Sequence, residues 1–255
     1  MKLATTIRAS LLSLGLSVVM IPATVSASAD DKAVRERISE TVRQASPGLQ
    51  VQEVNRTPIP GVREVLINGD VFYFSEDGRY MLQGELLDLK ERRSLTEQRR
   101  EGQRAAVLGG IDADSMLIYR AAGKPKHVIT VVTDIDCPYC RRFHEHMADL
   151  NARGVEVRYL LLPRAGVGSE SYRKAVSVWC ADKPLEAMTA AKQGKAVVDR
   201  QCEHAVDRHM ALSQRLGVTG TPAIITDAGG LIAGYLPPDE LLRRLGEMGS
   251  RRAGR

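Results

Sequence analysis

The chain has 255 residues, of which 44% are hydrophobic and 26% are charged, and its formal net charge is +5. This balance is ordinary for a soluble protein, so it gives no reason to expect a nucleic-acid partner. The length is sufficient for one large hydrophobic core or two modest ones.

The first 29 residues predict a secretory signal peptide. Lys2 and Arg8 give a positive start, Leu11–Ile21 is mostly apolar, and Ala27–Ala29 fits the small-x-small cleavage pattern. Cleavage would remove two basic residues and no acidic ones, so the net charge would fall from +5 to +3 and the mature chain would begin near Asp30. An uncleaved membrane anchor is the alternative, but the apolar run is short for a span.

Residues 30–88 predict a small antiparallel meander beside one helix. Apolar side chains at helical spacing place the helix over Asp31–Ala45. Three strands are expected to follow, with an Asn-Gly hairpin turn between the first two, over residues 62–67, 71–74 and 79–82. Such a unit has little core for its size, which favours pairing with a second copy.

Residues 89–114 predict a linker helix. Within it, Lys90–Arg104 carries six basic and three acidic residues, and Ser94–Glu97 matches a capping box at a helix start. Interleaved charges without aromatic residues indicate a solvated connecting helix better than a nucleic-acid patch. Gly109–Gly110 would allow a hinge after it.

The remaining residues, 115–255, predict a second domain. The β-branched run 128–132 is typical of a buried central strand, and a helical stripe follows over 143–150. A strand over 155–162 completes a parallel, right-handed βαβ unit. After an insertion at 164–200, we expect a helix, a strand hairpin and a final helix.

Cys137 and Cys140 lie three apart, between the predicted strand and the predicted helix. A Cys-x-x-Cys motif beside a βαβ unit indicates a thioredoxin-like redox site, although half of a zinc site and a structural pair are alternatives. With Pro138 in the first turn, Cys137 would be the helix N-cap, where free amides favour its thiolate. Cys140, one turn further on, could then attack a mixed disulfide. Asp134 and Asp136 would oppose this effect, because nearby carboxylates disfavour a thiolate.

The zinc alternative requires histidines beside the cysteines. His144 and His146 are two apart on a helix, so they point about 200° apart and cannot both face one metal. We therefore expect no metal and no cofactor other than the redox-active disulfide Cys137–Cys140. By spacing, His144 either lines the site or lies at the surface.

Thr221–Pro222 precedes a predicted strand. Only about 5% of X-Pro bonds in folded proteins are cis, but a proline that opens a strand in a Cys-x-x-Cys protein suits a cis loop facing the site. The backbone of Thr221 would then be free to pair with an extended peptide. A trans proline at the first residue of a strand is the alternative.

Cys180 and Cys202 are spaced for a structural disulfide across the insertion. The chain-entropy model gives such a bridge about 3 kcal/mol. A second redox pair is the alternative, which is less favoured because neither cysteine lies at a strand-to-helix junction.

Several motifs in this order resemble the DsbC/DsbG family of periplasmic thiol:disulfide interchange proteins. They are Thr133–Ile135, Cys140–Glu145, Gly220–Ala223 and Gly234–Pro238. The resemblance covers nearly the whole mature chain. It implies an α+β fold with a signal peptide at 1–29, a small cystatin-like α+β dimerisation domain at 30–88, a linker helix at 89–114 and a thioredoxin-like catalytic domain with a helical insertion at 115–255.

The resemblance also implies what the site residues do. Cys137 would be the nucleophile, Cys140 the resolving cysteine, Thr221 and Pro222 the cis-proline loop that binds substrate, and Cys180–Cys202 the structural disulfide. In the periplasm, a V-shaped homodimer would hold misfolded secreted proteins with non-native disulfides in an apolar cleft. A membrane reductant of the DsbD type would keep the dithiol reduced.

One departure concerns the residues between the cysteines. The DsbC branch has Gly-Tyr there, whereas this chain has Pro138-Tyr139, as in the DsbG branch and in glutaredoxins. We expect a disulfide isomerase that reshuffles non-native disulfides. A DsbG-like reductase that protects single cysteines from oxidation is one alternative, and a holdase chaperone that uses the dimer cleft is another.

Overall fold

The computed structural model describes residues 24–253. The predicted signal peptide lies outside the described residues except for residues 24–29, whose backbone forms the start of helix α1 (Thr24–Ala45). Within this described part of the chain, none of the helices combines the length and the apolar character needed to cross a membrane.

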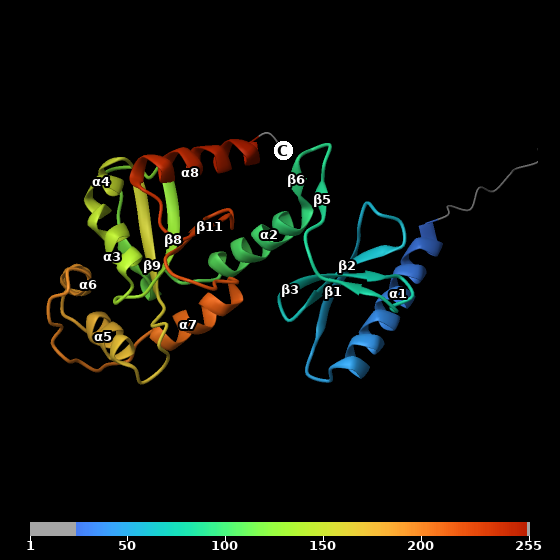
Figure 1. The fold of residues 1–255 in the computed structure, drawn as a ribbon, viewed down its shortest axis with the longest axis horizontal. Coiled ribbons are helices and arrows are strands. Elements are labelled where there is room, and N and C mark those ends of the chain that lie inside the picture. Colours follow the sequence, from blue (N-terminus) through green and yellow to red (C-terminus); the bar gives the residue numbers. More distant parts are fainter. Residues whose placement is uncertain (1–23, 254–255) are drawn as a thin grey trace, which may run out of the picture.

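The N-terminal domain is an antiparallel meander with α1 on one face (Figure 1). Its sheet has the order β1-β2-β3-β4, with the strands β1 (Val51–Arg56), β2 (Val62–Ile67), β3 (Asp70–Ser75) and β4 (Met81–Leu82). Val34, Ile38 and Val42 of α1 are buried against β2 and β3, as their four-residue spacing predicts. The predicted strand at 79–82 is wrong in length, because only two of its residues pair with β3.

Helix α2 (Leu95–Gly109) joins the two domains and follows a short hairpin of β5 (Leu87–Asp88) and β6 (Arg93–Ser94). Ser94 is the N-cap, and its hydroxyl accepts a hydrogen bond from the Glu97 amide at 2.9 Å. The helix was predicted to be a solvated connection, but Thr96 and Arg104 are buried. Thr96 bonds the Tyr73 hydroxyl of β3, whereas Arg104 donates to the carbonyl of Gly229 in the second domain. The linker helix is thus anchored at both ends.

The second domain is built on a five-stranded sheet in the order β11-β10-β8-β9-β7. The strands are β7 (Leu117–Tyr119), β8 (His127–Thr133), β9 (Val155–Leu161), β10 (Ala223–Thr226) and β11 (Leu231–Ala233). β8 and β9 pair in parallel, as predicted, whereas the other neighbouring strands pair antiparallel. The sequence analysis did not predict β7, which has only three residues and therefore little periodicity.

Helices cover both faces of this sheet. They are α3 (Pro138–Glu145), α4 (Met147–Ala152), α5 (Glu170–Trp179), α6 (Pro184–Lys192), α7 (Val206–Arg215) and α8 (Pro238–Ala253), with a short 3-10 turn at Ala113–Ser115 before β7. The predicted helix after the cysteines is interrupted at His146, which separates α3 from α4.

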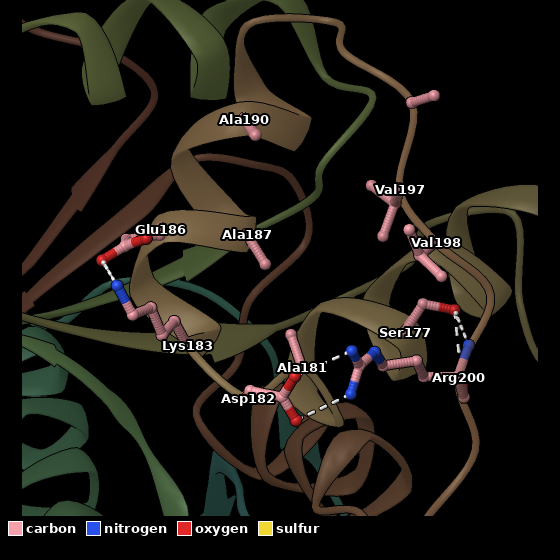
Figure 2. A pocket seen from close by; sticks show the side chains of 11 residues that line it. Ser177, Ala181, Asp182, Lys183, Glu186, Ala187, Ala190, Val197, Val198 and Arg200 are labelled. Atoms are coloured by element: carbon pink, nitrogen blue, oxygen red, sulfur yellow. Dashed lines mark hydrogen bonds and ion pairs between the residues drawn. The ribbon is translucent and has the colours of Figure 1, made fainter.

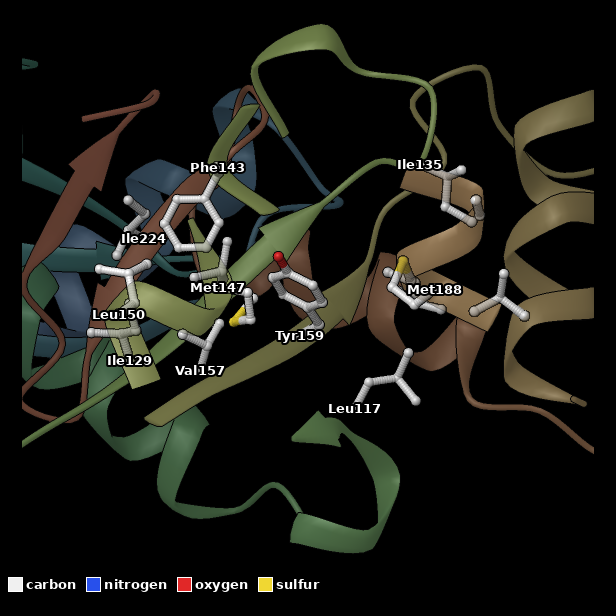
Figure 3. Packing of buried hydrophobic residues seen from close by; sticks show 14 of the residues in the cluster. Leu117, Ile129, Ile135, Phe143, Met147, Leu150, Val157, Tyr159, Met188 and Ile224 are labelled. Carbon is white, nitrogen blue, oxygen red and sulfur yellow. The ribbon is translucent and has the colours of Figure 1, made fainter. Parts of the chain in front are cut away.

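Alternate residues of β8 and β9 belong to two different hydrophobic clusters, because successive side chains of a strand point to opposite faces. Val131 and Tyr159 pack with residues of α3, α4, α5, α6 and α8, whereas Val132 and Leu160 pack with α7 and the end of α2. Figure 3 shows Tyr159 beside Met147 within the first cluster. This double cover explains why β8 is a nearly continuous β-branched run in sequence. In β9 two charged residues interrupt the apolar pattern, Glu156 and Arg158, which form an ion pair with each other.

Candidate active site

Cys137 lies where β8 ends and α3 begins. It is the N-cap of α3, with extended backbone angles (φ −74°, ψ 122°), and Pro138 occupies the first turn. Its side chain makes no capping hydrogen bond by the geometric criterion. Cys140 lies one turn further along α3, and both thiols are free and buried.

The Thr221–Pro222 loop covers Cys137. Its peptide bond is cis, and the Cys137 thiol lies 3.3 Å from the Thr221 carbonyl oxygen, to which it donates. β10 starts directly after the loop and pairs with β8, which fixes the loop beside the dithiol. The structure therefore brings together four predicted site residues from two segments. Thr221 and Pro222 lie more than eighty residues after Cys137 and Cys140 in the sequence.

The two thiols differ in their acidity. Burial raises the pKa of Cys137, but hydrogen bonding at Thr221 and Cys140 and the positive charge of Arg164 together hold that pKa below the usual value. Burial also raises the pKa of Cys140, and there it outweighs the charge of Lys192 and the hydrogen bonding around the thiol. The pair consequently has one thiol that favours the thiolate and one that keeps its proton.

Both aspartates that precede Cys137 are paired with cations. Asp134 is buried and accepts hydrogen bonds from the backbone amide and Nε of Arg164, at 3.0 and 3.1 Å. Asp136 accepts from Arg141 at 2.9 Å and from Lys174 at 3.2 Å. Each carboxylate that was expected to disfavour the thiolate thus has a neighbouring positive charge, which offsets its effect.

His144 lies neither beside the dithiol nor at the surface. Its Nδ1 is 3.0 Å from the Tyr159 hydroxyl and its Nε2 is 3.0 Å from the Thr189 hydroxyl. Burial, helped by the positive charge of Lys192, lowers the pKa of His144 to about 4. His144 is thus a neutral core residue that joins α3 to β9 and α6.

The sequence analysis missed two cations near the dithiol. Arg164 follows β9, and Lys192 is the last residue of α6, where it is only 4% exposed. Neither residue has a local signal, because each reaches Cys137 and Cys140 only through the packing of separate elements.

Cys180 and Cys202 form a disulfide with a Cα–Cα distance of 5.7 Å. The bridge ties the end of α5 to the irregular segment before α7. Trp179, beside Cys180, packs edge-on against the buried ring of His209. The disulfide thus holds the helical insertion closed.

A cavity of about 300 Å³ lies within the insertion, between α5, α6 and the segment before α7 (Figure 2). The cavity is lined by the exposed ion pair of Arg200 with Asp182 and by apolar side chains such as Val197 and Ala187. Neither Cys137 nor Cys140 lines it. This cavity is therefore separate from the dithiol.

Comparison with known families gives two matches along the chain. Residues 25–97 match the model described as disulfide bond isomerase protein N-terminal domain. Residues 113–249 match the model described as thioredoxin-like domain. The two matches fall on the meander with α1 and on the five-stranded sheet with its helices.

Curated relatives match most of the chain. The thiol:disulfide interchange protein DsbC of Dickeya dadantii is 38% identical over 92% of this chain and 92% of that protein. The DsbC protein of Escherichia coli strain K12 is 35% identical over 87% of this chain and 89% of that protein. Among solved structures, a disulfide interchange protein from Neisseria gonorrhoeae is 26% identical over 53% of this chain and 98% of that chain, with a TM-score of 0.47.

Proposed function

The chain belongs to the DsbC family of thiol:disulfide interchange proteins, and from that premise we propose that it reshuffles non-native disulfides with Cys137 as nucleophile and Cys140 as resolving cysteine. The observation that carries this assignment of roles is the position of Cys137 as the N-cap of α3 beside the Thr221 carbonyl, with Cys140 one turn further along the helix. The opposite directions in which the pKa values of the two thiols shift agree with it. A thiol that favours the thiolate is the attacking group in disulfide exchange.

The reaction needs two exchanges at Cys137. Its thiolate attacks one sulfur of a substrate disulfide, forming a mixed disulfide and releasing the other sulfur as a thiolate. A free thiol of the same substrate then attacks the mixed disulfide, so a new pairing forms and Cys137 leaves as thiolate. Where no correct thiol arrives, Cys140 attacks Cys137 and releases the substrate in reduced form.

The Thr221–Pro222 loop supports the binding of an extended peptide beside Cys137. The Thr221 carbonyl already lies within hydrogen-bond distance of the Cys137 thiol. A segment of substrate paired with this backbone would bring its own sulfur to the same place. The loop thus couples substrate binding to the reacting atom.

Replacing each cysteine separately tests the roles of the two thiols. We expect Cys137→Ala to lose nearly all reactivation of scrambled ribonuclease, because the attacking thiolate is gone. Cys140→Ala should keep part of the reactivation, since substrate thiols still release Cys137, and should accumulate mixed disulfides visible on non-reducing gels. Equal reactivation by Cys137→Ala and the unmodified chain would contradict the mechanism.

The dipeptide Pro138-Tyr139 supports a second candidate, a reductase that protects single cysteines from oxidation. Tyr139 is 60% exposed at the edge of the site, next to Cys137, where it can contact a folded substrate. Measuring reduction of a protein sulfenic acid and reactivation of scrambled ribonuclease on one preparation separates the two functions. Fast sulfenic acid reduction with poor reactivation favours the reductase.

A homodimer follows from the N-terminal domain as a further part of the proposal. β4 is an edge strand, and its residues Met81 and Leu82 are 57% and 63% exposed. Nearby Leu87 and Leu89 are also exposed. An edge strand with exposed apolar side chains favours pairing with another strand, here β4 of a second copy.

The export signal at residues 1–29 supports a periplasmic location, where disulfides form and persist. Isomerisation requires Cys137 and Cys140 to be reduced in that oxidising compartment, so a membrane reductant of the DsbD type belongs to the proposal. Apolar surface in the dimer would hold misfolded secreted proteins. A variant lacking both thiols measures that holdase activity by itself, as suppression of aggregation.

A further inference from the structure

Lys192 is a buried cation directly behind the dithiol. It ends α6 and is 4% exposed. Its Nζ donates to the Thr133 hydroxyl at 2.8 Å and to the Asp134 carbonyl at 2.7 Å. Both acceptors belong to the last residues before the Cys137–Cys140 motif.

Within the described residues no carboxylate forms an ion pair with this cation, although the charge of Asp134 acts on it at longer range. The carboxylate of Asp134 is bonded to Arg164 instead. A buried ammonium without a carboxylate is rare because its desolvation is costly. A compensating negative charge is therefore expected nearby.

The thiols are the groups that can provide that charge. Cys140 and Cys137 both interact electrostatically with Lys192, and the Thr133 hydroxyl that accepts from Lys192 also faces the Cys140 thiol. The other charged or titratable groups around Lys192 are Asp134, Arg141 and His144. His144 is bonded at both ring nitrogens by hydroxyl groups, and Arg141 is itself positive.

We propose that Lys192, acting through the Thr133 hydroxyl, is a positioning residue that stabilises the Cys140 thiolate when Cys140 attacks the mixed disulfide on Cys137. This inference rests on the proposed function and adds the group that governs its resolving step. Lys192 donates to the hydroxyl, the hydroxyl donates to the Cys140 sulfur, and the ammonium charge balances the thiolate. The buried ammonium thus favours the thiolate at the moment when Cys140 attacks.

The step balances without another reagent. The Cys140 thiol gives its proton to water, and its sulfur forms a bond to the Cys137 sulfur. The bond between Cys137 and the substrate sulfur breaks, and the substrate leaves as a thiolate that takes a proton from water. The dithiol loses two electrons and the substrate disulfide gains them, whereas Lys192 keeps its proton throughout.

A two-phase release assay isolates this step. Reduced protein is mixed with an aromatic disulfide, 5,5′-dithiobis(2-nitrobenzoate), which releases one coloured thiol when Cys137 attacks and a second when Cys140 resolves. Lys192→Met replaces the cation by an apolar chain of similar length. We expect the second phase of Lys192→Met to slow about threefold for each unit by which the pKa of Cys140 rises. A higher pKa lowers the fraction of Cys140 present as thiolate, and the higher nucleophilicity of that thiolate offsets only part of the loss. Lys192→Arg should retain most of the rate.

The pH profile distinguishes charge from packing. Burial, opposed by the charges of Cys140 and Asp134, lowers the pKa of Lys192 to about 8. The rate advantage of the unmodified chain over Lys192→Met should therefore be greatest below pH 8 and shrink above it, as the ammonium loses its proton. If Lys192 had only a structural role, the ratio of the second-phase rates of the unmodified chain and Lys192→Met would not vary with pH.

Three variants control the assay. Lys195→Met, at an exposed lysine after α6, should match the unmodified chain. Thr133→Val should slow the second phase, and combining it with Lys192→Met should add little, because both act through one hydrogen-bond chain. If Lys192→Met fails to fold, the second-phase rate of Thr133→Val and its dependence on pH test the role of Lys192 instead.

The outcomes separate the inference from the function it rests on. Two phases in the unmodified chain with an unchanged second phase in folded Lys192→Met would overturn the role of Lys192 alone. Absence of the second phase in the unmodified chain would instead contradict the proposed roles of Cys137 and Cys140.

Discussion

Cys137 and Cys140 are both buried, yet their neighbours make them chemically different. Cys137 adjoins Thr221 and the charge of Arg164, whereas for Cys140 burial outweighs the charge of Lys192 and the surrounding hydrogen bonds. Desolvation disfavours either thiolate, so the outcome depends on which thiol receives more hydrogen bonds and positive charge. These contacts are the basis of the proposed division into nucleophile and resolving cysteine.

Two buried histidines link stability to pH. Burial lowers the pKa of His144 and of His209 to about 4, and His209 holds Leu161 and Ser115 through its two ring nitrogens. In the unfolded chain the pKa of histidine is about 6.5, so the unfolded state binds more protons between these values. The stability contributed by the neutral rings is complete above about pH 6.5 and is lost as pH falls towards 4.

We therefore expect the free energy of unfolding to decrease between pH 7 and pH 4, by up to about 3 kcal/mol for each of these rings. Urea unfolding at fixed redox state across this range measures the decrease. His144→Gln should flatten the dependence, because an amide bonds the same hydroxyls without titrating. His127→Gln, at the partly exposed start of β8, is the matched control. If the free energy of unfolding of His144→Gln depended on pH as steeply as that of the unmodified chain, protonation of His144 would not be a cause of the decrease.

At the scale of elements, α2 depends on groups outside itself. Its first turn is capped by Ser94 and bonded to β3 through Thr96, while Arg104 near its end is paired with Glu97 and bonded to Gly229. A charged helix that would be marginal alone is stabilised by contacts with both domains.

Removing the cap should weaken this connection. We expect Ser94→Ala to lower the free energy of unfolding by about 1 kcal/mol, because the Glu97 amide loses its acceptor. Chemical denaturation measures the loss, and hydrogen exchange at the Glu97 amide localises it. Ser250→Ala replaces an exposed serine within α8 and should cause no such loss. Identical curves for Ser94→Ala and the unmodified chain would show that the cap contributes nothing.

In the whole molecule, the dithiol and the proposed dimer contact belong to two separate sheets. The five-stranded sheet carries the dithiol, and β4 is an edge strand of the meander. α2 lies between the meander and the five-stranded sheet (Figure 1). α2 fixes the distance between them. A dimer formed through β4 would hold two dithiols at a distance set by these helices.

A charge on β4 should prevent that dimer. We expect Leu82→Lys to sediment as a monomer at micromolar concentration, where the unmodified chain sediments as a dimer, because burying an ammonium at the contact is unfavourable. Leu185→Lys, on a partly exposed leucine of α6, should remain dimeric. If the unmodified chain is monomeric, β4 is not a dimer edge. Dithiol chemistry at Cys137 should persist in the monomer.

The order of the main elements and the pair of cysteines proposed to react could be predicted from the sequence. Strand periodicity is local, so β2, β3, β8 and β9 were predicted close to their bounds. α1 begins at Thr24, seven residues before the predicted start at Asp31. Cys137 before Pro138 at a strand-to-helix junction is also a local pattern. The α+β fold with a thioredoxin-like domain was confirmed.

Only the tertiary structure decided which charges surround the dithiol. Lys192 lies 52 residues beyond Cys140 and Arg164 follows a different strand, so no spacing in sequence indicates that both face the same pair of thiols. The packing of separate elements also determines that His144 and Arg104 are buried and that the edge of β4 is exposed. Electrostatics and burial depend on distances through space, and these are fixed only when separate elements pack together.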